Sequence, residues 1–328
     1  MQKINWGIIG CGDVTEVKSG PAFNKVPGSS LVAVMRRDAE KAADYARRHE
    51  VSKWYSDAKE LINDPEVNTV YIATPPSSHK ELSLLAIAAG KPVYVEKPMS
   101  MNVAEAKEMA ASAKEKNVKL TVAHYRRAQP KFKKIKELLA QNVTGDIRFV
   151  QLIFCRKALT AQELSVPKNA WRVDASIAGG GLFYDIAPHQ LDLMLYYFGE
   201  AASVNGIARN QAGIYSAADI VSGQIVFNSG IIFNGTWCFA AAKDEDEIKI
   251  VGTNGTICFS AFGSNDIFVE INGKTETFTF PELQHVQQPM IEEVVNYFSG
   301  KGNNPNTAEE GVIVMKWLGA MGGECVNV

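Results

Sequence analysis

Paired cysteines, long apolar runs and an excess of one charge sign are all missing from this sequence of 328 residues. The cysteines are scattered and never form a Cys-x-x-Cys pair, which argues against a disulfide framework and against a zinc site. No apolar stretch approaches the roughly 20 residues that a membrane span needs. Lys and Arg total 34 against 36 for Asp and Glu, so no strong field draws nucleic acid or an anionic membrane. We therefore expect no bound metal, no nucleic-acid partner and no membrane association.

The composition is that of an ordinary globular protein, with 46 % hydrophobic residues and enough length for two domains. The first residues lead directly into an apolar run, Ile4–Ile9, without a signal-peptide pattern before it. Together with the unpaired cysteines, this start predicts a cytoplasmic protein with reduced thiols.

Short apolar strands alternate with helical segments from the start of the chain to about residue 122. The strands are expected at residues 4–9, 31–35, 69–74, 93–95 and 119–123, and the helices at 16–24, 39–49, 57–63, 79–89 and 103–117. This alternation predicts an α/β domain with a doubly wound parallel sheet, and we assign residues 1–122 to it as a dinucleotide-binding domain.

The first strand is followed at once by a glycine turn, Gly10-Cys11-Gly12-Asp13-Val14. Gly10 permits a tight turn, and Gly12 lets a pyrophosphate approach the backbone where the next helix begins. Thr15 stands where the fingerprint has a third small residue. We expect one helix from this turn to about residue 24, and we count all five turn residues as cofactor-binding.

Two arginines, Arg36 and Arg37, stand at the end of the second strand, where a dinucleotide fold meets the adenosine ribose. Arginine there accommodates the 2′-phosphate of NADP, so we predict NADP as the cofactor, with NAD as the alternative. Two solvated arginines at a strand end are the simpler interpretation. Asp38 is interpreted as the cap of the following helix and not as a ribose ligand.

Two further strand ends should line the cofactor crevice, because the carboxyl ends of parallel strands share one edge of the sheet. The third strand ends in Thr74-Pro75, and the fourth in Glu96-Lys97. Pro98 discourages helix at Lys97 and holds it on a stiff turn. A surface Glu–Lys pair is the alternative interpretation. His79, at the start of a helix, joins the predicted cofactor-binding set.

The remaining residues, 123–328, are rich in strands joined by Asn-Gly and similar turns, which predicts a large, mostly antiparallel open sheet. The strands are expected at 147–156, 203–209, 220–227, 231–239, 247–251, 256–260, 267–271 and 274–280. Helices are expected at 130–142, 288–299 and 308–325. The basic residues of the first are interpreted as a solvated helix face. For the last helix, packing against the first domain is left open as an alternative. Phe233, Trp237, Phe239 and Phe259 indicate a second apolar sheet face, which we interpret as a subunit interface.

A triple glycine, Gly179–Gly181, precedes the pattern Asp185-x-x-x-His189. Asp185 and His189 are one helical turn apart and share a face, so the carboxylate can orient the imidazole for acid–base work. Pro188 predicts a helix that begins late, with His189 near its N-terminus. A capping Asp and a structural His are the alternative.

In the order and spacing of its motifs, this sequence resembles the Gfo/Idh/MocA family over nearly the whole chain. The motifs that carry the resemblance are the glycine turn, Glu96-Lys97-Pro98, and Gly179–Gly181 followed by Asp185 and His189. The resemblance implies NAD(P)-dependent oxidation or reduction of a sugar or cyclic polyol by a homodimer or homotetramer. It gives Lys97 contact with the reacting oxygen, His189 the proton, and Asp185 the positioning of both substrate and His189. Trp171 would form an aromatic wall for nicotinamide or sugar, Arg172 a polar contact beside it, and Tyr125 a substrate contact.

Two departures from the family pattern are Thr15 and the Ala187-Pro188 pair before His189, which bear on fine geometry and not on the reaction class. Two alternatives stay open. One is a non-catalytic NADP-binding sensor, which needs only the glycine turn and Arg36. The other is a dihydrodiol- or biliverdin-type reductase on the same domain plan.

Overall fold

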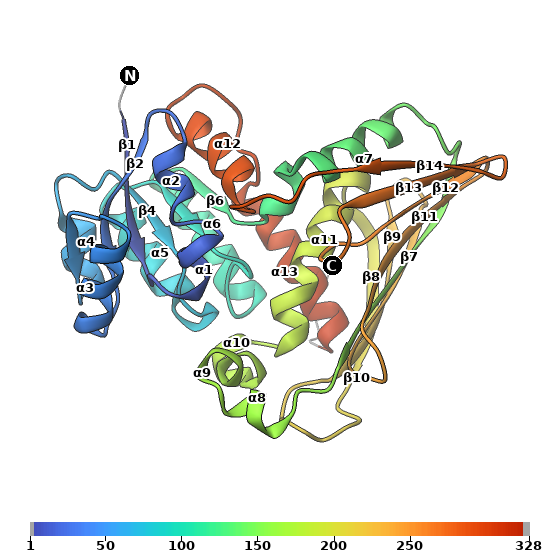
Figure 1. Cartoon of the computed structure of the whole chain (residues 1–328), viewed down its shortest axis with the longest axis horizontal. Coiled ribbons are helices and arrows are strands. Elements are labelled where there is room, and N and C mark those ends of the chain that lie inside the picture. Colours follow the sequence, from blue (N-terminus) through green and yellow to red (C-terminus); the bar gives the residue numbers. More distant parts are fainter. Residues whose placement is uncertain (1–2, 324–328) are drawn as a thin grey trace. The chain divides into compact units, whose positions relative to one another are not determined.

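The computed structural model in Figure 1 describes residues 3–323. The chain divides into two compact units. Unit 1 comprises the described residues up to Gln129 together with Leu283–Val312, and unit 2 comprises Pro130–Glu282 with the described residues from Ile313 on. This division differs from the expected boundary at residue 122, because Leu283–Val312 was assigned to the second domain. The apolar face of α12 (Gln288–Phe298) explains the difference, since Met290 and Val294 join the core that holds Trp6.

Unit 1 contains the predicted parallel sheet, with the strand order β3-β2-β1-β4-β5-β6. The strands are β1 (Ile4–Ile9), β2 (Ser29–Met35), β3 (Lys53–Tyr55), β4 (Thr69–Ile72), β5 (Val93–Val95) and β6 (Leu120–Val122). β1, β4 and β5 are almost completely buried, as expected of strands with both faces covered. The three-residue β3 was not predicted, because it is too short and too exposed to leave a pattern.

The helices of unit 1 largely follow the predicted alternation. They are α1 (Asp13–Val17), α2 (Ala22–Lys25), α3 (Ala39–Arg48), α4 (Ala58–Asn63), α5 (His79–Ala88), α6 (Val103–Glu115) and α12, with the 3₁₀ turns η1 (Pro76–Ser78) and η2 (Tyr125–Ala128). The single helix expected up to residue 24 is wrong, since α1 and α2 are separate. Gly20 lies against the backbone, where an added Cβ would be 2.2 Å from the Thr15 carbonyl oxygen, and Pro21 precedes α2.

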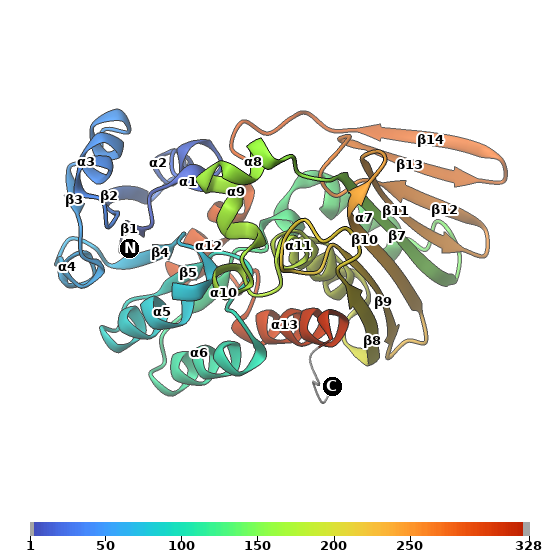
Figure 2. The same cartoon turned by 90° about the horizontal axis from the view of Figure 1, so that it is seen from below.

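Unit 2 contains the predicted open sheet, with the order β14-β13-β12-β11-β7-β10-β9-β8 (Figure 2). The strands are β7 (Ile147–Lys157), β8 (Ala201–Arg209), β9 (Ile220–Phe227), β10 (Ile232–Ala241), β11 (Glu245–Gly252), β12 (Gly255–Phe259), β13 (Asp266–Ile271) and β14 (Lys274–Thr279). Neighbouring strands are antiparallel except for β7 and β10, which are parallel. The sheet is therefore mostly antiparallel, as predicted.

The helical elements of unit 2 are α7 (Pro130–Ala140), α8 (Ala161–Ser165), α9 (Pro167–Ala170), η3 (Trp171–Val173), α10 (Ala175–Ala178) and α11 (Leu182–Phe198). The boundary between the units falls within α13 (Ala308–Gly322), and residues 324–325 of the helix predicted there lie outside the described part of the chain. None of the helices formed by residues 3–323 is long and apolar enough to cross a membrane.

The interpretation of four aromatic residues as a second apolar sheet face is wrong. Phe233, Trp237, Phe239 and Phe259 are all buried. Trp237 donates a hydrogen bond of 2.6 Å to Gln190 of α11, and Phe132 of α7 packs against Phe259. Because side chains alternate along a strand, the odd-numbered residues of β10 from Phe233 to Phe239 lie on this covered face.

Candidate functional site

The glycine turn after β1 has the geometry of a phosphate-binding loop. Gly10 has φ +92°, and a Cβ added there would lie 2.7 Å from Cγ2 of Thr74, so only glycine fits. The N–H groups of Gly10 and Cys11 donate to the carbonyl of Met35 at 2.9 and 3.1 Å. At Gly12, the residue before α1, a Cβ would meet nothing closer than the Gly10 carbonyl at 3.8 Å. The space above Gly12 therefore suits the close approach of a pyrophosphate.

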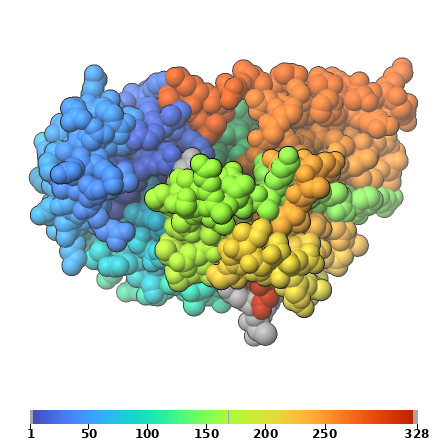
Figure 3. Space-filling model, turned by 60° about the horizontal axis from the view of Figure 1, so that its bottom comes forward, coloured from blue at the N-terminus to red at the C-terminus, as the bar shows by residue number. Residues whose placement is uncertain are grey.

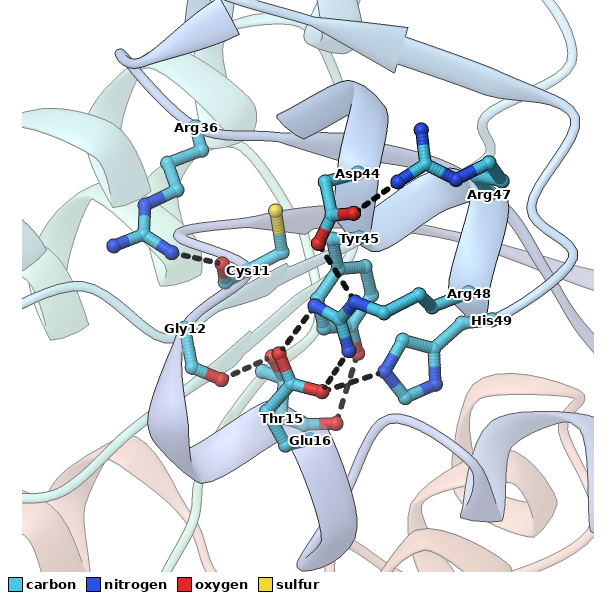
Figure 4. Close-up of polar contacts among 10 residues, drawn as sticks. All are labelled: Cys11, Gly12, Thr15, Glu16, Arg36, Asp44, Tyr45, Arg47, Arg48 and His49. Atoms are coloured by element: carbon cyan, nitrogen blue, oxygen red, sulfur yellow. Dashed lines mark hydrogen bonds and ion pairs between the residues drawn. The ribbon is translucent and has the colours of Figure 1, made fainter. Parts of the chain in front are cut away.

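Thr15 fits beneath this turn because its hydroxyl has a backbone partner. The side chain is fully buried and donates a hydrogen bond of 2.8 Å to the Gly12 carbonyl (Figure 4). The Tyr45 hydroxyl of α3 donates to the Thr15 carbonyl at 2.8 Å, and burial raises the pKa of Tyr45. The departure from the family pattern is thus accommodated by the hydrogen bond of the Thr15 hydroxyl to the Gly12 carbonyl.

Arg36 lies beside the glycine turn. Its backbone N–H donates to the Tyr55 carbonyl at 3.2 Å, and its Nη1 donates to the Cys11 carbonyl at 3.4 Å (Figure 4). Arg37 is exposed. The interpretation of Asp38 as a helix cap is confirmed, since its carboxylate accepts from the Lys41 N–H at 3.1 Å. This strand end therefore presents a guanidinium to the place where a dinucleotide fold holds the ribose.

His79 is buried and connects two strand ends. Its Nδ1 lies 2.9 Å from the Pro98 carbonyl oxygen, and its Nε2 lies 2.8 Å from the Thr74 carbonyl oxygen. Burial lowers the pKa of His79, although the two carbonyls oppose that shift. Both ring nitrogens thus face the protein backbone. The side chain positions the turns after β4 and β5, and its contact with the cofactor stays a prediction.

Glu96 is likewise buried, and it anchors the turn that carries Lys97. Its Oε1 accepts from the Tyr71 hydroxyl at 2.5 Å and from Gln287 Nε2 at 2.7 Å, and its Oε2 accepts from the Lys97 N–H at 3.2 Å. Burial, and then the Glu96 charge, holds the pKa of Tyr71 well above its usual range. Glu96 therefore positions Lys97, and Gln287 is a supporting residue that no sequence motif indicated.

Lys97 stands at the carboxyl end of β5, the location that the sequence predicted. Its side chain is half-buried, and the Lys97–Pro98 peptide is cis. Tyr125 is buried in η2, with the Arg126 guanidinium 5.6 Å from its ring centre. The catalytic role of Lys97 and the substrate contact of Tyr125 stay predictions.

In unit 2, the triple glycine before α11 is required by the protein's own packing. Gly179 and Gly181 have φ values of +81° and +69°. An added Cβ would lie 2.0 Å from the Tyr184 ring at Gly180, and 2.4 Å from the Ala217 Cβ at Gly181. The glycines therefore fix the start of α11 against its neighbours.

The predicted late start of α11 is wrong, because the helix begins at Leu182 and encloses Pro188. A proline inside a helix costs about 3 kcal/mol through its lost hydrogen bond and its steric clash. Burial of each Phe or Leu side chain contributes about 1.5–3 kcal/mol, and Phe183, Leu191 and Leu195 are all buried. Packing therefore outweighs the local penalty.

Three of the predicted site residues of unit 2 contact one another, because Arg172 forms an ion pair with Asp185 and a cation–π contact with Trp171. Arg172 Nε lies 3.0 Å from Asp185 Oδ2, and the Arg172 guanidinium lies 4.5 Å from the centre of the Trp171 ring. Figure 3 shows residues 169–178, in yellow-green, at the surface of this unit. The ion pair gives Asp185 a partner that sequence reasoning had not assigned to it.

His189 lies further along α11 and is buried, with 3 % of its surface exposed. The centres of its ring and the Phe262 ring are 5.6 Å apart, with the two rings nearly perpendicular, a contact that no sequence motif indicated. Lys97 belongs to unit 1 and His189 to unit 2, and their convergence on one substrate stays a prediction.

Comparison with known proteins gives consistent matches. Residues 4–124 match a profile described as "Oxidoreductase family, NAD-binding Rossmann fold", and residues 132–258 match the "GFO/IDH/MocA C-terminal domain". Oxidoreductase P35 of Formosa agariphila is 48 % identical over 95 % of this chain and 96 % of its own length. Trans-1,2-dihydrobenzene-1,2-diol dehydrogenase of Sus scrofa is 32 % identical over 77 % of this chain and 72 % of its own length. A levoglucosan dehydrogenase, solved with NADH and levoglucosan, shares the fold with a TM-score of 0.85 and 24 % identity. The match covers 97 % of this chain and 95 % of that protein.

Proposed function

The chain belongs to the Gfo/Idh/MocA family of oxidoreductases with an NAD-binding Rossmann domain, and on that premise we propose an NADP-dependent sugar or polyol oxidoreductase. The reaction moves a hydride between nicotinamide and a carbinol or carbonyl carbon of a sugar, sugar derivative or cyclic polyol. One observation carries the proposal: Lys97 stands at the end of β5, and Asp185 and His189 stand on α11, in a chain that also keeps the glycine turn.

The residues of unit 1 fit a dinucleotide. The backbone from Gly10 to Val14 would hold the pyrophosphate, since Gly12 leaves space above the start of α1. Arg36 and Arg37 would hold the 2′-phosphate of NADP, because guanidinium groups bind phosphate oxygens in pairs. When bound, the nicotinamide supplies or accepts the hydride.

The side chains of the protein handle the substrate oxygen and its proton. The Lys97 ammonium stabilises the negative charge that develops on the reacting oxygen. His189 accepts or donates the hydroxyl proton. Asp185 holds a substrate hydroxyl, and its ion pair with Arg172, whose guanidinium contacts the Trp171 ring, keeps it oriented.

The substrate class has two candidates within this chemistry. The first is a sugar or anhydrosugar, as the family resemblance implies. The second is a cyclic vicinal diol, favoured by the relative named trans-1,2-dihydrobenzene-1,2-diol dehydrogenase. Both are ring carbinols, so the same roles of Lys97 and His189 serve either substrate.

Turnover separates the enzyme from a non-catalytic NADP-binding sensor. NADPH oxidation is followed with a panel of keto-sugars, and NADP⁺ reduction with sugars, polyols and cyclic diols, while fluorescence measures cofactor binding. Turnover that disappears in Lys97→Met, with cofactor binding retained, supports the enzyme. Cofactor binding without turnover on any substrate would replace the enzyme with the sensor.

We also infer a cytoplasmic location, which the composition of the chain supports. The cysteines among residues 3–323 are all free thiols, as is usual in reducing compartments. Fractionation of cells that carry the tagged full chain tests the location, and recovery in a periplasmic or secreted fraction contradicts it.

A further inference from the structure

The loop between β12 and β13, residues 260–265, is held by two side chains of opposite charge. Asp246 of β11 accepts three backbone N–H groups of the loop, from Ala261 at 3.1 Å, Phe262 at 2.6 Å and Gly263 at 3.0 Å. A carboxylate that accepts several backbone N–H bonds fixes their directions strongly, because each bond is charge-assisted. The middle of the loop is therefore attached to β11.

The ends of the same loop are attached to α7. Lys131 Nζ donates to the carbonyl of Ser260 at 2.7 Å and to that of Ser264 at 2.5 Å. Only 6 % of Lys131 is exposed, so for this residue the interpretation of the basic helix as a solvated face is wrong. Together, Asp246 and Lys131 leave the backbone of the loop little freedom.

Phe262 is the side chain that this arrangement places. The centre of its ring lies 5.6 Å from the ring centre of Phe154 of β7, with an angle of 68° between the ring planes. The centre of the His189 ring of α11 is also 5.6 Å away, and the planes of those two rings are at 73°. Asp246 and Phe154 are paired in the register of β11 and β7. The residue that holds the loop backbone and the residue that packs against the Phe262 ring are therefore neighbours on the sheet. The Phe262 ring therefore has a fixed place against the imidazole.

We propose that Asp246 is a positioning residue for His189. Its carboxylate fixes the backbone of residues 261–263, this backbone fixes the Phe262 ring, and the ring holds the imidazole in one orientation. The inference rests on the proposed function, in which His189 moves the substrate proton. Proton transfer needs hydrogen-bond reach and alignment, so a buried imidazole that can rotate loses rate even though every catalytic group is present.

The test compares Asp246→Asn with Glu247→Gln, an exposed neighbour on the same strand. The amide of the first variant keeps only one accepting oxygen, so its NH2 group would face either the Ala261 N–H or the N–H groups of Phe262 and Gly263, and the loop should loosen. We expect Asp246→Asn to lower kcat about tenfold, with KM and NADPH affinity within about twofold of the unmodified protein. Glu247→Gln should leave all three values unchanged. Phe262→Leu, which keeps the loop anchors and removes only the ring, should reproduce the loss in kcat.

A second measurement does not depend on turnover. The imidazole C–H signals of His189 are recorded by NMR with NADP bound, and His189→Gln identifies them among the signals of the five histidines. The Phe262 ring current should shift these signals, so Asp246→Asn and Phe262→Leu should both move them toward ordinary histidine positions. Glu247→Gln should not move them.

The outcomes separate the two hypotheses. If the unmodified protein turns over no substrate but the signals move as expected, the proposed function fails while the contact between loop and imidazole stands. If the protein is active and Asp246→Asn and Phe262→Leu both leave kcat unchanged, the positioning role is overturned. It is also overturned if Asp246→Asn unfolds and Phe262→Leu, well folded, keeps full kcat and unshifted signals.

Discussion

At the scale of single residues, Arg36 should decide which nicotinamide cofactor binds. Its guanidinium lies beside the glycine turn, and Arg36→Asp replaces a partner for the 2′-phosphate with a charge that repels it. We expect the variant to bind NADP(H) more weakly and NAD(H) equally well or better. Fluorescence titration with both cofactors measures the change.

Arg47→Ala is the control for this substitution. Arg47 is an exposed arginine of α3 that pairs with Asp44, so its removal lowers the net charge without changing the strand end. The control should keep the NADP preference. Equal affinities of the unmodified protein for the two cofactors would contradict the assignment of Arg36.

His189 should control the proton step. His189→Ala removes the group that accepts or donates the substrate proton, and the loss of a general acid–base catalyst costs on the order of 10²–10⁴-fold in rate. We expect kcat to fall by this amount and the pH profile to flatten near neutrality, while NADPH affinity is retained. Steady-state kinetics from pH 5 to pH 9 checks both effects; a variant that keeps the rate and the profile shape would exclude His189 from the step.

The sequence predicted residues at strand ends better than buried supporting residues. Arg36, Asp38 and Lys97 stand where expected, because parallel strands bring their carboxyl ends to one edge. The supporting role of Glu96 could not be predicted, since its partner Gln287 is 191 positions away in the chain. A buried polar group takes its role from its neighbours, and these are known only once the chain is folded.

At the scale of elements, Glu16 of α1 connects to α3 by ionic hydrogen bonds. Arg48 donates to both of its carboxylate oxygens at 2.7 and 2.9 Å, and His49 Nε2 lies 2.8 Å from one of them (Figure 4). The bonds from Arg48, more than the other causes, lower the pKa of Glu16 from 4.5 to about 2. Ionised Glu16 therefore stabilises the fold above pH 4.5, and this contribution is lost as the pH falls toward about 2.

Glu16→Gln should therefore lower the free energy of unfolding at pH 7 by a small amount, because the pair is partly exposed. The difference between the two proteins should narrow as the pH falls below 4.5. Urea unfolding at a series of pH values measures it. A difference that stays constant down to the lowest pH at which both proteins fold would argue against the depressed pKa.

The start of α11 should tolerate no side chain at Gly180. Gly180→Ala would place a Cβ 2.0 Å from the Tyr184 ring, so the ring or the helix must shift. We expect the free energy of unfolding to fall by about 1–3 kcal/mol, the usual cost of overpacking. Urea unfolding measures it, and Gly302→Ala is the control, since its nearest neighbour is 3.8 Å away. Equal stability of the two variants would contradict the packing role of the triple glycine.

The elements themselves were largely predictable, because most follow from apolar periodicity and turn residues. The failures have local causes. The break between α1 and α2 depends on the close approach of Gly20 to the Thr15 carbonyl, and the long α11 depends on burial that outweighs Pro188. Neither effect can be read from residue types, since each depends on what the fold places nearby.

At the scale of the whole molecule, the chain does not divide in sequence order. Leu283–Val312 belongs to unit 1, although unit 2 precedes it. Gln287 shows why the sequence could not indicate this. Its side-chain amide donates a hydrogen bond to Glu96 of unit 1, but a single glutamine before a helix belongs to no motif that would predict such a partner. Sequence reasoning predicted two domains with the correct sheets and offered only the last helix, 308–325, for a return to the first, whereas the segment that returns is Leu283–Val312.

The uncovered sheet face of unit 2 is our candidate for a subunit interface. Val251, Phe149, Ile232 and Val226 are paired in register across β11, β7, β10 and β9, on the face opposite the buried Val150 and Phe233. Phe149 and Ile232 remain 40 % and 38 % exposed. A continuous apolar row on an exposed sheet is typical of a protein–protein contact. We therefore predict a homodimer or homotetramer that buries this face.

Ile232→Lys places a charge in the middle of this row, and Phe149→Lys places one beside it, since the two residues are register partners. We expect the double variant to be monomeric by light scattering at micromolar concentration, because each subunit would bury unpaired ammonium groups. Ile214→Lys is the control: Ile214 is also 40 % exposed but lies outside the strands. The control should keep the oligomer. A monomeric unmodified protein, or a double variant that still associates, would remove this face from the interface and leave its apolar row without a partner.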